Sequence, residues 1–185
     1  MIKKSKGAAS WLQTTTVRVT RVHFVFVAAY VASIVIFDSW NLYTHDAVGE
    51  LWTAAGILLV INTLFWYISR SKYRDSVYIA IVQLLVLADI AFAAYNVYWQ
   101  QGLSSKSVAL FAVPIVAAAA LRSRSTLLAA ASLSSVAYSV VTVRYFFDHY
   151  GESYRVELWG TVGFYCAVFF VLAGLLMIVV RPTDV

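Results

Sequence analysis

The chain has 185 residues, of which 62% are hydrophobic and only 12% are charged, whereas soluble globular domains average about 45–50% and about 25%. This composition excludes a soluble protein, and the aromatic content of 16% with only 2 Pro excludes a disordered one. A single cysteine, Cys166, excludes a disulfide framework and a cysteine-based metal site. The net charge of +5 would suggest an acidic partner for a soluble chain. Here its distribution between apolar segments is more informative, and we expect no nucleic-acid partner.

Six runs are apolar enough to form transmembrane helices, because a helix rises about 1.5 Å per residue and crosses the roughly 30 Å hydrocarbon layer with about 17–25 residues. In chain order they cover residues 22–37, 51–68, 77–97, 103–121, 126–147 and 158–180. The fourth run is the weakest, since its strictly apolar part is short and contains Pro114, and a re-entrant hairpin is the competing interpretation there. We therefore predict an all-α, polytopic membrane protein, a compact bundle of six transmembrane helices.

Basic residues predict how this bundle is oriented, because Lys and Arg are retained on the cytoplasmic side. Eleven of the 14 basic residues lie in segments 1–21, 70–74, 122–124 and at position 181, and only three lie in the alternate segments. We therefore expect a multi-pass protein of the cytoplasmic (inner) membrane with both termini cytoplasmic. Residues 1–21 are predicted as a basic cytoplasmic or juxtamembrane segment, either a retention signal or a segment along the inner surface, and 181–185 as a short cytoplasmic tail.

Asp89 lies in the middle of the third run, where an ionisable side chain costs at least about 2.5–3.5 kcal/mol unless it is paired, hydrated or neutral. On a helix, Asn96 and Gln100 share a stripe with Asp89, and this stripe should face the bundle interior. Two interpretations are open for Asp89: a group that senses protons or a ligand, or a polar tie between helices. Asn62 in the second run is expected to form a hydrogen bond across a helix interface.

The last two runs each carry a stripe of small side chains. The stripes consist of Ser132, Ser135, Ser139 and Thr142 in the fifth run and of Gly160, Gly163, Ala167 and Gly174 in the sixth. Small residues let helix backbones approach closely in lipid, so both stripes predict packing seams. A polar cavity is the alternative for the serine stripe, and Ser135 and Ser139 are therefore further candidates for ligand or proton sensing.

The sequence predicts no cofactor and no metal site. His45 and His149 lie in different outer segments beside Asp46 and Asp148, and these four residues are the candidate ligands if a divalent ion binds at all. A solvated acidic surface is the other interpretation. We do not expect an enzyme, because the chain lacks His-Glu-x-x-His, Gly-x-Ser-x-Gly and Gly-rich phosphate motifs and a second intramembrane acid.

Five short segments from residue 78 onward occur in the order known from one protein family. They are 83–89, 102–105, 111–117, 121–124 and 127–131. This order resembles the six-helix membrane input domain of bacterial sensor histidine kinases, particularly those that govern type IV pilus genes. The resemblance implies a role in signal input to a two-component system without kinase activity, either as an excised sensor or as a free-standing relative.

These observations together lead to one expected function and one alternative. We expect a non-catalytic integral membrane sensor that detects a stimulus at or within the bilayer and transmits it through helix motion. Its expected partners, besides the lipid bilayer, are a second copy of the chain or a membrane or cytoplasmic protein. The alternative is a small accessory or structural subunit, or a transport component, of a membrane protein complex.

Overall fold

The computed structural model describes residues 10–100, 102, 105–149 and 155–180. Within these ranges the chain forms six α-helices and one 3-10 helix and no strand. The elements are α1 (Trp11–Ser39), α2 (His45–Ser69), α3 (Asp75–Trp99), η2 (Lys106–Phe111), α4 (Ala112–Ala119), α5 (Arg124–His149) and α6 (Arg155–Val180). The predictions for residues 1–9, 103–104 and 181–185 lie outside the described residues.

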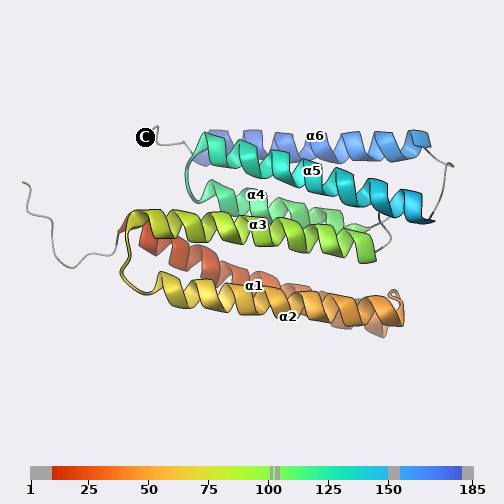
Figure 1. Ribbon diagram of the computed structural model, residues 1–185, viewed down its shortest axis with the longest axis horizontal. Coiled ribbons are helices and arrows are strands. Elements are labelled where there is room, and N and C mark those ends of the chain that lie inside the picture. The colour runs from red at the N-terminus through yellow and green to blue at the C-terminus, as the bar shows by residue number, and fades with distance from the viewer. Residues whose placement is uncertain (1–9, 101, 103–104, 150–154, 181–185) are drawn as a thin grey trace, which may run out of the picture.

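Successive helical segments run in opposite directions along one common axis (Figure 1). The start of α1, the end of α6 and the turns at 70–74 and 120–123 gather at one end, which we call the basic end. The turn at 40–44 and the ends of α3 and α5, at 98–100 and 145–149, gather at the opposite end, which we call the aromatic end. The first and last described helices therefore begin and finish at the same end of the bundle.

Five of the described helices are long and apolar enough to cross a membrane: α1, α2, α3, α5 and residues 156–180 of α6. All five expose large apolar side chains on their outer faces. Such continuous apolar surface is unfavourable in water and is what lipid covers. The described fold thus indicates a multi-pass membrane protein, as the composition predicts.

The fourth segment differs from the regular helix predicted over 103–121. It starts as the 3-10 helix η2 and becomes α-helical only at Ala112, so that Pro114 falls in the first turn of α4, where its missing N–H is least harmful. Its 14 residues from Lys106 to Ala119 span about 24 Å at the rises of the two helix types. Phe111 and Ile115 are fully buried, so one face of this segment packs against the other helices, whereas Val116 on another face is exposed. Irregular backbone is tolerated at membrane depth only in such a protected place.

The first helix begins at Trp11, well before the predicted start at Val22. The hydroxyl of Ser10 caps it by accepting a hydrogen bond from the backbone N–H of Gln13. Thr16 and Thr20 then face the bundle and are fully buried, which explains why this polar stretch continues the helix. Residues 11–21 are therefore part of α1, and a separate segment lying along the membrane surface is wrong for them.

Helix α3 lies at the centre of the bundle and contacts α1, α2, α4 and α5. One apolar cluster joins α1, α2 and α3, and a second joins α3 to α4, α5 and α6. Helix α6 lies at the periphery, and a Cβ atom added at Gly160, Gly163 or Gly174 would meet nothing within 4 Å. The glycine stripe is therefore no packing seam within this chain. The central place of α3 makes it the element through which the two halves of the bundle are coupled.

Candidate functional site

The buried Asp89 has a partner on α1. Its Oδ2 atom lies 2.7 Å from Nε2 of His23, and both side chains are almost completely buried. Two turns further along both helices, the hydroxyl of Tyr30 donates a hydrogen bond to Oδ1 of Asn96. Both pairs are separated by 66 positions in the sequence, so α1 and α3 run in parallel with constant register. We call these two pairs the polar ladder.

Aromatic rings fill the space between the two rungs of the ladder. The ring of Phe92 makes edge contacts with Phe26 and with Tyr30, at centroid distances of 6.2 and 4.8 Å. The amide nitrogen of Asn96 donates to the backbone carbonyl of Phe92 at 2.7 Å, which fixes the amide orientation. The polar atoms of the ladder are thus enclosed by apolar rings, a setting in which electrostatic interactions are strong and unpaired groups are costly.

The second carboxylate oxygen of Asp89 takes no part in the polar ladder. Oδ1 of Asp89 is buried and has no hydrogen-bond partner among the described residues. On the neighbouring interface, the side-chain amide of Asn62 donates to the backbone carbonyl of Thr20 at 3.1 Å and joins α2 to α1, as predicted for Asn62. The polar contacts of α1 therefore tie it to both of its neighbours.

Sequence reasoning placed Asp89 and Asn96 correctly on a buried stripe but missed His23 as the partner. With the first span predicted to begin at Val22, His23 lay at its edge. Because the helix begins at Trp11, His23 lies about 18 Å along it. The signal that could have identified it is that His23 is the only histidine within an apolar run, while a membrane-buried acid needs a partner.

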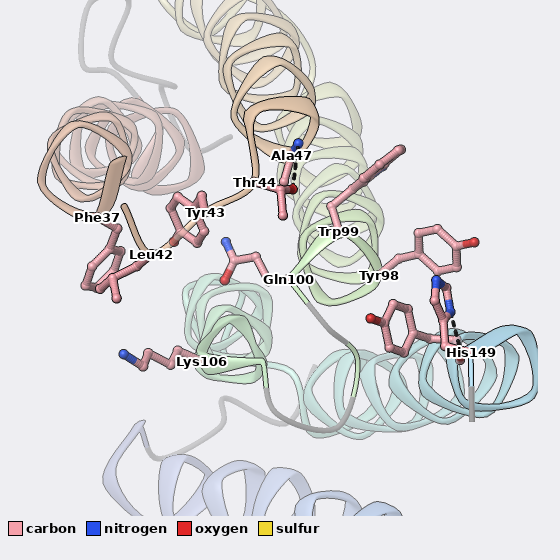
Figure 2. Close-up of a pocket in the computed structure, with 11 residues that line it drawn as sticks. Phe37, Leu42, Tyr43, Thr44, Ala47, Tyr98, Trp99, Gln100, Lys106 and His149 are labelled. Carbon is pink, nitrogen blue, oxygen red and sulfur yellow. Dashed lines mark hydrogen bonds between the residues drawn. The ribbon is translucent and has the colours of Figure 1, made fainter. Parts of the chain in front are cut away.

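A cavity of about 500 Å³ opens at the aromatic end (Figure 2). It is bounded by the end of α1, the α1–α2 turn, the start of α2, the end of α3, the start of η2 and the end of α5. The lining residues are Phe37, Leu42, Tyr43, Thr44, Ala47, Tyr98, Trp99, Gln100, Lys106, Tyr145 and His149. The volume lies within the roughly 300–1,000 Å³ of small-molecule sites, and an apolar, aromatic wall with a few polar groups is typical of them.

The polar groups of this cavity come from separate elements. Gln100, which ends the stripe of Asp89 and Asn96, extends into the space beside Tyr43 (Figure 2), and its Oε1 accepts a hydrogen bond from the Ser107 hydroxyl at 2.6 Å. The ammonium of Lys106 lies 5.2 Å from the centre of the Phe37 ring. Burial raises the pKa of the Tyr43 phenol above its usual 10.0, so the neutral form persists to higher pH than in an exposed tyrosine.

His149 forms one wall of the cavity together with aromatic rings. Its ring stacks on Tyr145 at a centroid distance of 4.0 Å, and its Nδ1 lies 2.9 Å from the Tyr145 carbonyl oxygen. A Cβ atom at Gly102 would lie 2.4 Å from Cδ1 of Tyr145. Gly102 adopts a φ of 58° and leaves the room that Tyr145 occupies. The glycine of this turn therefore positions one wall of the cavity.

The four candidate metal ligands do not form a cluster. His45 and Asp46 are exposed at the start of α2. Asp148 pairs instead with Arg144 at 3.7 Å and accepts a long hydrogen bond from the hydroxyl of Tyr98. Among the described residues no group of three or more His, Cys, Asp or Glu side chains could hold a metal ion.

The serine candidates lie on an interface that the ladder does not reach. The hydroxyl of Ser139 donates to the backbone carbonyl of Ser135 at 2.7 Å and lies 3.5 Å from the Cys166 sulfur on α6. Ser135 and Ser139 therefore belong to the α5–α6 seam, whereas the ladder joins α3 to α1. Ser132, predicted on the same stripe, is exposed. The structure thus brings Asp89 and Asn96 together with His23 and Tyr30, and the serines together with Cys166.

Comparison with known proteins adds no relative: no family model, no curated protein and no solved structure matches this chain.

Proposed function

We propose that this protein is a non-catalytic sensor of the cytoplasmic membrane, with both termini in the cytosol, that binds a small molecule at the aromatic end and passes the signal on by helix motion. The observation that carries the proposal is the cavity at that end, whose walls come from α1, α2, α3, η2 and α5. A ligand that contacts five elements at once stabilises one arrangement of those elements over another. A shift in population between two helix arrangements is all that a sensor without catalytic groups requires.

Helix α3 provides the connection between this cavity and the membrane interior. Tyr98, Trp99 and Gln100 at its end line the cavity, and Asp89 lies further down the same helix. A displacement of α3 along or about its axis changes the register with α1, on which both rungs of the polar ladder depend. The buried pairs therefore favour discrete registers over a continuum, because intermediate positions leave buried polar groups unpaired.

The proposed orientation follows from charge. The turns of the basic end carry Arg70, Lys72, Arg74, Arg122 and Arg124. Since basic residues are retained in the cytosol, the cavity faces the outside, and the start of α1 and the end of α6 lie inside, where a kinase or another partner receives the signal. The resemblance to the input domains of sensor kinases supports the same assignment, with signal input and no kinase activity.

The test is to ask whether the native membrane supplies a molecule that occupies the cavity. The protein is extracted in mild detergent, and the molecules bound to it are identified by native mass spectrometry. The Leu42→Trp variant fills the cavity from an exposed lining position. Val156→Trp is the matched control, because Val156 is exposed at the start of α6 and does not line the cavity.

We expect a small molecule on the wild type and on Val156→Trp, and none on Leu42→Trp. Hydrogen exchange should then show that the ligand-bound wild type protects amides in α3 more than the empty variant does. A small molecule that stays bound to Leu42→Trp contradicts the proposal. Recovery of the wild type without a small molecule but with a recurrent, stoichiometric membrane protein contradicts it as well and favours the complex subunit.

A further inference from the structure

Three arginines surround one hollow at the basic end. Arg18 and Arg21 of α1 and Arg70 at the end of α2 line a hollow of about 350 Å³, together with Gln13, Thr14 and Val17. The spacing of Thr14, Val17, Arg18 and Arg21 places all four on one face of α1. The hollow therefore lies between two helices, with guanidinium groups on both sides.

No carboxylate forms an ion pair with these three arginines within the described residues. The ion pairs found there join His23 to Asp89 and Arg144 to Asp148, and neither includes an arginine of the hollow. The backbone carbonyl oxygens of residues 69, 70 and 71 at the end of α2 lie 3.3 to 3.4 Å from Nε2 of Gln13, which donates to them. Three like charges around one hollow repel each other, so an anion that enters it is bound favourably.

The walls of the hollow are held in place by contacts between α1 and the end of α2. The same Gln13 contacts fasten the first turn of α1 to the end of α2. The guanidinium of Arg70 lies 4.8 Å from the centre of the Trp66 ring, and Trp66 in turn makes an edge contact with Phe24 of α1. These contacts fix the distance between α1 and α2 without a bound ligand.

The position of the hollow along the bundle identifies the source of the anion. Arg21 directly precedes Val22, and both Val22 and Val25, one turn deeper, are exposed to more than 60%. On α2, Leu64 and Tyr67 are exposed in the turns that precede Arg70. The apolar surface that lipid covers therefore begins at the hollow, which places the guanidinium groups at the level of the lipid phosphates.

We propose that this hollow binds the phosphate group of an anionic phospholipid, whose acyl chains lie along the exposed apolar faces of α1 and α2. Guanidinium groups suit this ligand, since they bind phosphate oxygens in pairs through parallel N–H donors and accept desolvation more readily than ammonium groups. Basic hollows between transmembrane helices on the cytoplasmic side recognise lipid headgroups in this way. The proposal is independent of the ligand in the cavity at the aromatic end.

A competing explanation is that Arg18, Arg21 and Arg70 only retain their helix ends in the cytosol, as any basic residue at that end does. If the hollow binds lipid, removal of its three arginines should weaken binding more than removal of three basic residues elsewhere at the same end; if only general charge matters, both removals should have the same effect. The test variant is therefore Arg18→Gln/Arg21→Gln/Arg70→Gln. The control is Lys72→Gln/Arg74→Gln/Arg124→Gln, which removes three positive charges from the same end but none from the hollow.

The full chain is purified in a neutral detergent, and binding of phosphatidylglycerol and of phosphatidylcholine is titrated by native mass spectrometry. Each basic residue near an anionic headgroup contributes roughly fivefold to affinity, so the wild type should prefer phosphatidylglycerol by at least about tenfold. The hollow variant should lose this preference, and the control should keep it within about twofold. Inorganic phosphate in excess should displace little lipid, because it lacks the acyl chains.

Equal loss of preference in both triple variants overturns the proposal in favour of general charge, and so does a wild type without preference. Full displacement by inorganic phosphate overturns the lipid as ligand and identifies a free-phosphate site. If the hollow variant fails to fold, Arg18→Lys/Arg21→Lys/Arg70→Lys replaces it: this variant keeps the charge but loses the paired donors. It should bind phosphatidylglycerol several-fold more weakly than the control, and wild-type affinity contradicts the proposal.

Discussion

The buried pair of His23 and Asp89 allows a quantitative prediction by a double-mutant cycle. The two side chains are 4% and 1% exposed and lie 2.7 Å apart. Removing one partner of a buried pair leaves the other uncompensated and destabilises a protein by about 3–5 kcal/mol, whereas replacing both by apolar residues is often close to neutral. We therefore expect His23→Ala and Asp89→Ala each to cost about 3 kcal/mol or more, and the double variant to cost clearly less than their sum.

The expected coupling free energy is at least about 2 kcal/mol, above the maximum of about 1.7 kcal/mol measured for ordinary hydrogen bonds between transmembrane helices. The measurement is equilibrium unfolding in mixed micelles with increasing denaturing detergent, followed by circular dichroism. The chain offers its own control in Arg144 and Asp148, a pair four residues apart with side chains 74% and 47% exposed. Its coupling should be about 0.5 kcal/mol or less. A coupling for His23 and Asp89 no larger than this would refute the role of the pair as the main tie between α1 and α3.

Two further predictions concern the second rung and the cavity wall. Tyr30→Phe removes the donor to Asn96 and should destabilise the bundle by about 0.6–1.7 kcal/mol in the same unfolding assay, and an unchanged unfolding curve contradicts a rung at this level. Gly102→Ala should destabilise the bundle by more than about 1 kcal/mol, since L-residues are strained at positive φ and the added Cβ collides with Tyr145. The control is Gly56→Ala, because a Cβ atom at Gly56 meets nothing within 4 Å. This variant should leave stability unchanged or raise it by up to about 1 kcal/mol. If Gly56→Ala loses as much stability as Gly102→Ala, the proposed role of Gly102 in the turn is contradicted.

Five of the predicted spans agree with the structure because hydropathy alone determines them. Helices α1, α2, α3, α5 and α6 each contain the predicted run and extend beyond it at one or both ends. The extension is longest at the start of α1, where Arg18 and Arg21 lower the mean hydropathy although Thr16 and Thr20 are buried against the bundle. The regular helix predicted for the fourth segment was wrong, because packing against other helices permits irregular backbone that no hydropathy pattern reveals.

The candidate site was only partly predictable. The helical period places Asp89 and Asn96 on one buried face, and burial of both confirms it. The partners His23 and Tyr30 depend on the register between two helices 66 positions apart, and periodicity within one helix carries no information about that register. The cavity is less predictable still, because its wall is assembled from five elements that are far apart in the sequence.

The most direct test of the whole account is the side of the membrane on which each turn lies. Single cysteines are placed at Ser39, Ser71 and Ser125, all exposed, in a chain carrying Cys166→Ala, and intact cells are treated with a membrane-impermeant maleimide. We expect that Ser39→Cys at the aromatic end is labelled, whereas Ser71→Cys and Ser125→Cys at the basic end react only after the cells are opened. Labelling of Ser125→Cys in intact cells would show that the fourth segment does not cross the membrane. Labelling of Ser71→Cys in intact cells, in contrast, would mean that the cavity and the arginine hollow do not face opposite sides of the bilayer.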